Sequence, residues 1–310
     1  MIKFGFIGGT IRGLKLIEAL LDYGYLPTFA VILKEDDHEH EKHSIKITTI
    51  LNERGIANSI KKKLNASDYE LIKSSALDLM IVSGWRTLIR TDVNEYLKYG
   101  MIAAHQSLLP KYRGFAPTQW AIINGEKETG VTLFRIEEGE VDSGMVFSQR
   151  TVEISDEDYG FDLDQKFARI TIEMYLELFE SVKAGSVEFM KQNEDDATYA
   201  CKRVPQDGRV DWNRTSVEVY NLIRALAYPY SGAFCFLGER CFIIRRVTYG
   251  KNNHKKYVGN IPGRVIGIFP EGIEVLCGKG SVLLTQWEEK GIGIVRCPSD
   301  DVKSINTTLM

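Results

Sequence analysis

Residues 2–21, IKFGFIGGTIRGLKLIEALL, decide the fold of the first half of the chain. The apolar run Ile2–Ile7 is typical of a short buried strand, and Gly8-Gly9-Thr10 supplies the turn that follows it. Leucine and isoleucine then recur at helical spacing from Leu14 to Leu21. A strand that leads through a glycine turn into an amphipathic helix is the opening unit of a parallel sheet covered by helices.

The same alternation continues through the first half of the chain. Further strands are predicted at residues 28–33, 79–82, 99–104, 131–136 and 146–154, and helices at 67–77 and 161–182. This order predicts an α/β fold with a mostly parallel sheet, in which ligands bind at the carboxyl ends of the strands. Gly84, His105 and the loops after them are expected at that edge.

From residue 205 the pattern changes to short strands separated by glycine turns. A helix that begins at the capping box Thr215–Glu218 comes first. Strands are then predicted at residues 232–237, 241–247, 263–268, 273–277 and 281–286, a spacing that favours a small antiparallel barrel. We therefore expect one domain over residues 1–185, a polar linker over 186–204 and a second domain over 205–310.

Composition narrows the class of protein. The chain has 310 residues, of which 44% are hydrophobic and 26% charged, as in globular proteins and unlike disordered or fibrous ones. No apolar run approaches the roughly 20 residues that cross a bilayer, and the first residues lack the pattern of a signal peptide. The five cysteines show no C-x-x-C spacing, so neither a disulfide framework nor a metal site is predicted. We expect a cytoplasmic protein without a membrane partner.

The residues with the clearest chemical potential lie between 99 and 145. His105 follows a predicted strand, and an unperturbed imidazole titrates near pH 6.5, where proton transfer at neutral pH needs it. A glycine-flanked acidic turn, Glu137–Gly144, offers a carboxylate that can orient an imidazole. Taken singly, a structural histidine and a solvated loop are the alternative interpretations.

Together these residues resemble the folate-dependent N-formyltransferases, a family that acts on methionyl-tRNA, glycinamide ribonucleotide or nucleotide-linked amino sugars. The resemblance is carried by His105, by Ser107-Leu108-Leu109-Pro110-Lys111-Tyr112-Arg113-Gly114, by Thr129-Gly130-Val131-Thr132 and by Asp142-Ser143-Gly144. Asp211-Trp212 and the run Tyr228–Ala233 resemble the start of the family's second domain. The resemblance covers about the whole chain and implies a Rossmann-like formyltransferase domain followed by an OB-like β-barrel.

The resemblance also implies the catalytic residues. Formyl transfer from 10-formyltetrahydrofolate to an amine needs a group that takes the amine's proton and a donor that stabilises the oxyanion. His105 is implied at that site, with Asp142 orienting it and favouring its charged form. The family's oxyanion donor is an asparagine two residues before the histidine, and this chain has Ala103 there.

Alanine has no hydrogen-bond donor, and the loss of one oxyanion donor typically costs about 10²–10³ in rate. The chain is therefore expected to be impaired. Two explanations stay open: a deliberate substitution at the active site, or a natural loss that leaves the protein inactive or dependent on another group.

Further residues are implied by position in the same resemblance. The folate cosubstrate is expected at two groups of residues, Arg86, Thr87, Leu88 and Ile89 on one side, and Leu109, Glu138, Gly139, Val141 and Asp142 on the other. The acceptor is expected at Gly9, Thr10, Arg12, Ser107, Lys111, Tyr112 and Arg113. Gly8-Gly9-Thr10 is not a G-x-G-x-x-G fingerprint, so no nicotinamide cofactor is implied.

The distribution of charge along the chain indicates which class of molecule accepts the formyl group. A tRNA enzyme needs basic surfaces, because phosphate contacts dominate nucleic-acid affinity. Residues 35–41 are instead acidic, and residues 205–310 hold 14 Lys and Arg against 10 Asp and Glu, a weak bias. We expect a nucleotide-linked deoxyamino sugar for a surface polysaccharide, no nucleic-acid partner and a possible homodimer. The alternatives are a methionyl-tRNA formyltransferase and a non-catalytic relative that binds nucleotide-sugar or folate.

Overall fold

The structure is a computed structural model that describes residues 2–36 and 42–310. The chain divides into two compact units, each assembled from three separate stretches of sequence. The first unit contains Met1–Gly114, Gly130–Val152 and Gln165–Tyr199, and the second contains Phe115–Thr129, Glu153–Asp164 and Ala200–Met310. The acidic run that we expected over residues 35–41 lies outside the described residues from 37 onward.

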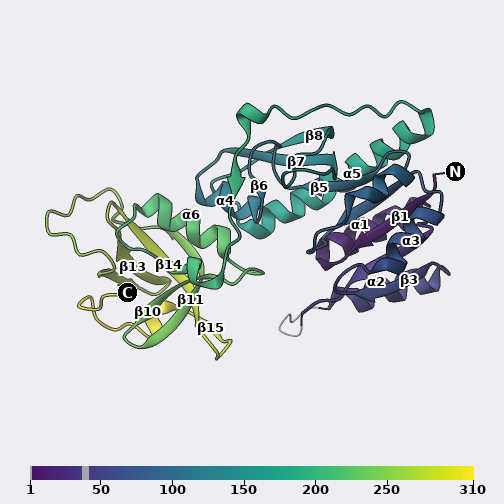
Figure 1. The fold of residues 1–310 in the computed structure, drawn as a ribbon. Helices are drawn as coiled ribbons and strands as arrows, with labels where there is room; N and C mark the ends of the chain where they lie inside the picture. Colours follow the sequence, from purple (N-terminus) through teal and green to yellow (C-terminus); the bar gives the residue numbers. More distant parts are fainter. Residues whose placement is uncertain (1, 37–41) are drawn as a thin grey trace. The chain divides into compact units, whose positions relative to one another are not determined.

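The first unit is built on a seven-stranded sheet of order β3-β2-β1-β4-β5-β7-β8 (Figure 1). Neighbours from β3 to β5 pair in parallel, whereas β7 runs antiparallel to β5. The strands are β1 (Phe4–Gly8), β2 (Phe29–Leu33), β3 (Ala57–Lys61), β4 (Leu79–Ser83), β5 (Met101–His105), β7 (Glu128–Arg135) and β8 (Val146–Glu153). The chain order reverses between β1 and β4, which is where ligands bind in sheets of this kind.

Helices cover both faces of this sheet. They are α1 (Thr10–Asp22), α2 (His43–Glu53), α3 (Ala66–Ser74) and α5 (Gly160–Ala184), with the 3-10 turns η1 (Thr91–Tyr96) and η2 (Glu194–Asp196). One face packs through the Phe4 and Phe179 rings of β1 and α5, whose centroids lie 5.0 Å apart. The other face buries Met80, Val82 and Met101 against α3 and η1.

Side chains alternate across a strand, so Met101, Ala103 and His105 of β5 share this second face. Met101 is fully buried in the core, whereas Ala103 is partly exposed near the end of the strand. The sheet therefore carries the predicted catalytic positions from its core to its carboxyl edge.

A close approach of two turns defines that edge. Gly84, after β4, has a backbone φ of +68°, and a Cβ built on it would lie 2.2 Å from the carbonyl oxygen of Gly9. The Gly9 N–H in turn donates to the carbonyl of Ser83 at 3.0 Å. Only glycine accommodates both the positive φ and this contact. The turn after β1 and the loop after β4 are thus held together.

The second unit contains a six-stranded antiparallel sheet of order β10-β11-β14-β13-β12, with β15 beside β14 (Figure 1). Its strands are β10 (Ala233–Leu237), β11 (Arg240–Tyr249), β12 (Val265–Phe269), β13 (Gly272–Leu276), β14 (Ser281–Glu289) and β15 (Val295–Arg296). Its helices are α4 (Pro117–Ile123) and α6 (Ser216–Leu226), with the turns η3 (Pro205–Gly208) and η4 (Pro298–Asp300).

Residues 307–310 connect the two edge strands of this sheet. The Val265 N–H of β12 donates to the Thr307 carbonyl at 2.9 Å, and Phe236 of β10 exchanges two backbone hydrogen bonds with Met310. The backbone polar groups that an open sheet leaves on both edges are thereby partly satisfied. The predicted antiparallel sheet is confirmed, and its closure into an OB-like barrel stays a prediction.

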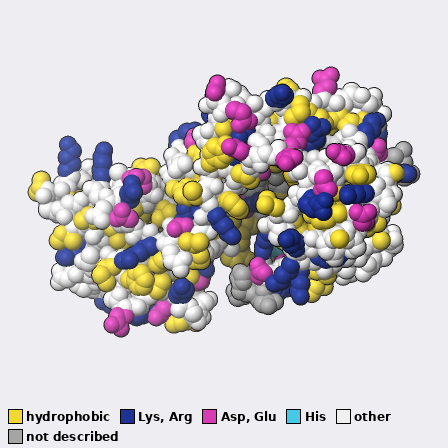
Figure 2. All heavy atoms as spheres, in the orientation of Figure 1, with side chains coloured by type: hydrophobic (Ala, Val, Ile, Leu, Met, Phe, Trp, Pro, Cys, Tyr) yellow, Lys and Arg dark blue, Asp and Glu magenta, His cyan; other side chains and the backbone are white. Residues whose placement is uncertain are grey.

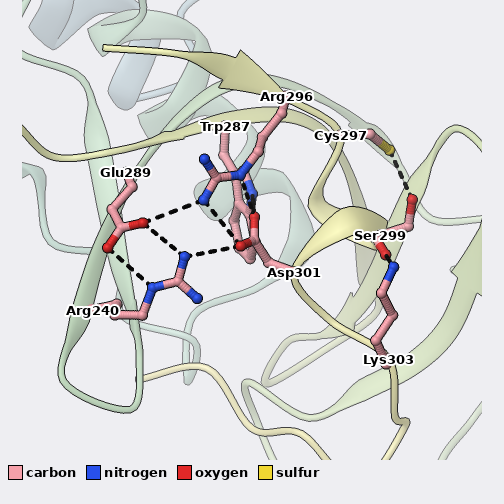
Figure 3. Close-up of polar contacts among 8 residues, drawn as sticks. All are labelled: Arg240, Trp287, Glu289, Arg296, Cys297, Ser299, Asp301 and Lys303. Carbon is pink, nitrogen blue, oxygen red and sulfur yellow. Dashed lines mark hydrogen bonds and ion pairs between the residues drawn. The ribbon is translucent and has the colours of Figure 1, made fainter. Parts of the chain in front are cut away.

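A charged cluster ties the edge of this sheet together, as Figure 3 shows. Arg240 donates to Glu289 at 2.7 Å and to Asp301 at 2.9 Å, while Arg296 donates to Asp301 at 2.6 Å. The Trp287 indole N–H also donates to Asp301, at 3.1 Å. Both arginines are paired with carboxylates, so the cluster joins β11, β14 and β15 to the segment after η4.

Most expected elements are present, with some corrections. Helix α6 begins at the predicted Thr215–Glu218 capping box. Helix α3 was expected over 67–77 but covers Ala66–Ser74, because Asn65 and Asp68 form the capping box at its start. Helix α2 and strand β3 were not predicted. Glu35, the first residue of the acidic run, is buried and accepts a hydrogen bond from the Ser44 N–H at the start of α2.

Two short polar strands form a separate two-stranded sheet. Strand β6 (Arg113–Gly114) pairs with β9 (Tyr199–Ala200). Among residues 2–36 and 42–310, no helix has both the length and the apolar character that crossing a bilayer requires. The expected boundaries at 185 and 205 stay a prediction, since the compact units are interleaved in sequence.

We predict that Arg224→Met lowers the free energy of unfolding by about 2 kcal/mol, because the buried Asp158 carbonyl and the part-buried Ser155 carbonyl lose their donor. Arg224 is 2% exposed and donates to the carbonyls of Ser155 and Asp158, both at 2.8 Å. Urea unfolding followed by tryptophan fluorescence measures the change. Arg214→Met is the control, since its side chain is 65% exposed and its loss should cost under about 0.5 kcal/mol. Equal losses for both variants would contradict this account.

Candidate active site

His105 is the last residue of β5 and lies between two hydrogen-bond acceptors. Its Nε2 is 2.8 Å from the carbonyl oxygen of Tyr112, and its Nδ1 is 3.4 Å from Oδ2 of Asp142. The imidazole side chain is 10% exposed and the Asp142 side chain 18% exposed. The structure therefore brings the predicted histidine and carboxylate together, although 37 residues separate them in sequence.

The identity of these partners constrains the proton on the ring. A carbonyl oxygen only accepts, so Nε2 donates to Tyr112. Nδ1 then carries a lone pair when the imidazole is neutral and a second N–H when it is charged. Only the charged ring donates to both neighbours. Nδ1 is the ring nitrogen that faces Asp142.

The Asp142 carboxylate is itself oriented by backbone. Oδ2 accepts from the Gly114 N–H at 2.9 Å, so the loop after β5 positions the acid as well as the histidine's other partner. Asp142 has a backbone φ of +54°, in the left-handed region that non-glycine residues rarely adopt. The rest of this turn is open: Glu138, Gly139 and Val141 are all exposed.

Arg113 requires a correction. We expected its side chain to bind the acceptor, but it is completely buried. Its guanidinium donates to Gln192 through Nε and Nη2, to Glu194 through Nη1 and Nη2, and to Tyr199 through Nη1. These contacts use all five N–H donors of an arginine. The hydrogen bond to Glu194 raises the pKa of Arg113 and holds that of Glu194 below its usual range. Arg113 therefore organises the loop instead of contacting a substrate.

Ser107 needs a similar correction. It is 1% exposed, and its hydroxyl donates to the Lys111 carbonyl. Its own carbonyl accepts from Thr132 Oγ1 at 2.7 Å. Lys111 is exposed, as an acceptor-binding residue would be. Tyr112 contributes its backbone carbonyl to His105, a role that no side-chain motif indicates.

Leu109 is buried among the apolar residues beside Ala103, with Phe134 and Val146. Its N–H donates to Thr132 Oγ1 at 3.1 Å, and its carbonyl accepts from the Gln149 amide at 2.7 Å. Thr132, which is fully buried, therefore joins the loop after β5 to β7. The Leu109–Pro110 peptide bond in this loop is cis.

The segment 85–89 carries two polar atoms that lack partners. Trp85 Nε1 and Thr87 Oγ1 are both buried and have no hydrogen-bond partner among residues 2–36 and 42–310. Trp85 and Ile89 pack against the same apolar cluster as Ala103. Leu88 is 90% exposed, and Arg86 is also exposed.

The remaining predicted acceptor residues follow β1. Gly9 is buried and precedes α1, while Thr10 adopts a backbone φ of +59° as its first residue. Arg12 is exposed on the first turn of that helix. Because Gly84 contacts Gly9, this turn adjoins the start of the 85–89 segment.

Comparison with known proteins agrees with this geometry. A family model for formyl transferase matches residues 28–179, and one for the formyl transferase C-terminal domain matches residues 202–296. The chain belongs to the formyltransferase family.

Three solved structures share the fold of this formyltransferase. WlaRD, a sugar 3N-formyl transferase crystallised with dTDP and 5-N-formyl-THF, is 18% identical with a TM-score of 0.69, over 94% of this chain and 98% of its own. An N-formyltransferase from Helicobacter canadensis, in complex with folinic acid and dTDP-3-aminofucose, is 20% identical with a TM-score of 0.67, over 92% and 99%. HypX from Aquifex aeolicus with tetrahydrofolic acid is 19% identical with a TM-score of 0.64, over 98% and 47%.

An open cavity of about 650 Å³ in the formyltransferase's first unit is lined by Arg90, Asn94, Glu137 and Glu138, among others. It borders the end of the 85–89 segment and the acidic turn, so it adjoins both predicted folate-binding stretches. Within the described residues, no cluster of His, Cys, Asp or Glu is arranged to hold a metal ion.

Sequence reasoning missed several residues of this site. Gln192 donates to the carbonyls of Asp142 and Gly144, both at 2.7 Å, yet it lies in the segment that we expected to be a linker. Its partners are about 50 and 80 residues away in the chain, so no local pattern signals the contact. Trp85 precedes the segment expected to bind folate, but no sequence pattern indicates that its indole N–H lacks a hydrogen-bond partner among the described residues.

Proposed function

We propose that this formyltransferase moves a formyl group from 10-formyltetrahydrofolate to the amino group of a nucleotide-linked deoxyamino sugar, for a surface polysaccharide. The observation that carries the proposal is the His105–Asp142 pair at the carboxyl edge of a formyltransferase sheet. Related folds were solved with folates and with dTDP or a dTDP-amino sugar, which supports both substrates.

In the proposed mechanism the acceptor amine attacks the formyl carbon, and His105 receives the amine's proton at Nδ1 while the neighbouring Asp142 carboxylate stabilises the imidazolium. The imidazolium then gives this proton to N10 as the bond from N10 to the formyl carbon breaks, which releases tetrahydrofolate and returns His105 to its neutral form. The Tyr112 carbonyl keeps Nε2 protonated throughout, so the ring presents a single basic nitrogen. Arg86, Thr87, Leu88, Ile89 and the turn from Glu138 to Asp142 would hold the folate.

Ala103 is expected to limit the rate of formyl transfer, because it stands where the family has its oxyanion donor. It faces the same side of β5 as His105 and packs against the cluster that contains Leu109 and Phe134. A methyl group donates no hydrogen bond to a developing oxyanion. Ala103 also packs against the cluster of Met80, Val82 and Met101, which Trp85 borders, and the Trp85 indole N–H has no hydrogen-bond partner among residues 2–36 and 42–310.

A nucleotide-sugar acceptor is supported over tRNA by the distribution of charge. On the face drawn in Figure 2, Lys and Arg side chains of the second unit alternate with Asp and Glu and form no continuous basic stripe. The 14 basic and 10 acidic residues over 205–310 give little attraction for phosphates. All five cysteines are free, which supports a cytoplasmic location. Dimer formation remains a proposal that light scattering tests.

Ala103→Asn should raise the rate of formyl transfer about 10²–10³-fold, because it supplies the missing oxyanion donor. The assay measures formylated product from 10-formyltetrahydrofolate and a panel of dTDP-, UDP- and GDP-amino sugars. Ala104→Asn is the matched control, since Ala104 lies on the opposite face of β5 and should give no gain. If neither variant shows turnover while nucleotide-sugar still binds, the protein is a non-catalytic binding relative.

Asp142→Asn, made together with Ala103→Asn, should lower turnover about 10²-fold, which is the low end of a general acid–base contribution. The neutral amide still accepts from the Gly114 N–H but no longer stabilises an imidazolium. Folate affinity, measured by fluorescence titration, should stay within about twofold of the parent. Unchanged turnover would remove Asp142 from the mechanism.

Binding of formylatable methionyl-tRNA tests the alternative acceptor. We expect weak binding of the tRNA. A plot of the logarithm of the binding constant against the logarithm of the salt concentration should have a slope near zero, because few phosphates are neutralised. A nucleotide-sugar ligand titrated under the same conditions is the control. Tight tRNA binding with a steep negative slope would favour the methionyl-tRNA enzyme.

A further inference from the structure

Residues 190–199, which we call the strap, contact both loops that flank His105. We propose that Gln192 of this strap is a positioning residue that holds Asp142 against the imidazole. The proposal rests on the proposed function, since it assigns a purpose to the pair that would transfer the proton.

The orientation of the Gln192 amide is fixed by its partners. Its Oε1 accepts from Arg113 Nε at 3.1 Å and Nη2 at 2.7 Å. Its Nε2 donates to the carbonyls of Asp142 and Gly144, both at 2.7 Å. An arginine only donates and a carbonyl only accepts, so a flipped amide would lose all four contacts. Gln192 therefore links a fully buried cation to the acidic turn.

The acidic turn needs such support. Asp142 has a backbone φ of +54°, a conformation that persists only where the surroundings enforce it. The Gln192 amide bonds the carbonyl of Asp142 itself and that of the second residue after it. The outer part of the turn is held by Tyr199, whose hydroxyl donates to Glu140 and whose pKa is raised by that hydrogen bond.

The strap also fixes the other partner of His105. Thr198 Oγ1 accepts from the Tyr112 N–H at 2.8 Å, and the Thr198 carbonyl accepts from the Arg113 N–H at 2.8 Å. The Thr198 N–H donates to the Pro110 carbonyl at 3.1 Å. The strap thus positions both acceptors that flank the imidazole, the Tyr112 carbonyl and the Asp142 carboxylate. Gln192 is the residue through which the strap contacts the acidic turn.

Gln192→Glu separates this role from general stability. A carboxylate at 192 still accepts from Arg113, so the buried cation keeps its partner. It cannot donate to the two carbonyls, and its charge repels them, so the turn should move away from His105. Asn193→Ala is the matched control, because Asn193 is exposed and its side chain bonds Asp195 and Asp196 of the strap and, among the described residues, no part of the acidic turn.

The first readout is the ¹⁵N NMR spectrum of the histidine rings, with His105 assigned by its absence in His105→Gln. Asp142→Asn should shift the Nδ1 signal of His105, and Gln192→Glu should reproduce at least half of that shift. Asn193→Ala should leave the signal in place. An unchanged His105 signal in a Gln192→Glu protein whose melting temperature is within a few degrees of the parent would overturn the proposal.

The second readout is kinetic and uses the Ala103→Asn protein as parent. Gln192→Glu should lower the rate of formyl transfer about tenfold, within the range that positioning effects reach. Added to Asp142→Asn, it should lower the rate less than twofold further, because both changes act through one pair. Full additivity would contradict a positioning role. If no acceptor is formylated at all, the proposed function fails, and the NMR result alone decides the role of Gln192.

Discussion

The site depends on one imidazole held between two acceptors of different kinds. The Tyr112 carbonyl accepts a hydrogen bond from Nε2, and the Asp142 carboxylate faces Nδ1. Both partners belong to loops, yet each is tied to the sheet or to the strap by backbone hydrogen bonds. This arrangement places a single base at a defined point, as proton transfer from an attacking amine requires.

The sheet explains why the pair lies at that point. Parallel strands β1, β4 and β5 end at one edge, and the Gly9 and Gly84 turns meet there closely enough to exclude any side chain at residue 84. Ala103 and His105 face this edge from β5, and the unpaired Trp85 and Thr87 atoms border it from the loop after β4. The proposed proton acceptor, the segment expected to bind folate and Ala103, where the resemblance implies an oxyanion donor, thus lie on or directly after neighbouring strands.

Much of this arrangement is predictable from sequence, and the rest depends on long-range contacts. Apolar runs such as Leu79–Ser83 predict buried strands because few other structures suit them, and the Thr215–Glu218 box fixes the start of α6. Strand β3 escaped prediction because its residues, ANSIK, lie at a sheet edge and none of them is buried. Arg113 was assigned to the substrate because an arginine in a motif does not reveal its partners. Those partners, Gln192, Glu194 and Tyr199, follow some 80 residues later in a polar stretch that resembles a linker.

The central claim is that His105 accepts the proton during formyl transfer, and His105→Gln in the Ala103→Asn protein tests it most directly. Mass spectrometry of the nucleotide-sugar after incubation with 10-formyltetrahydrofolate measures the product. The account predicts that the Ala103→Asn parent forms the N-formyl sugar and that His105→Gln forms almost none, although folate still binds. Formylation by the glutamine variant at a rate close to that of its parent would contradict the claim.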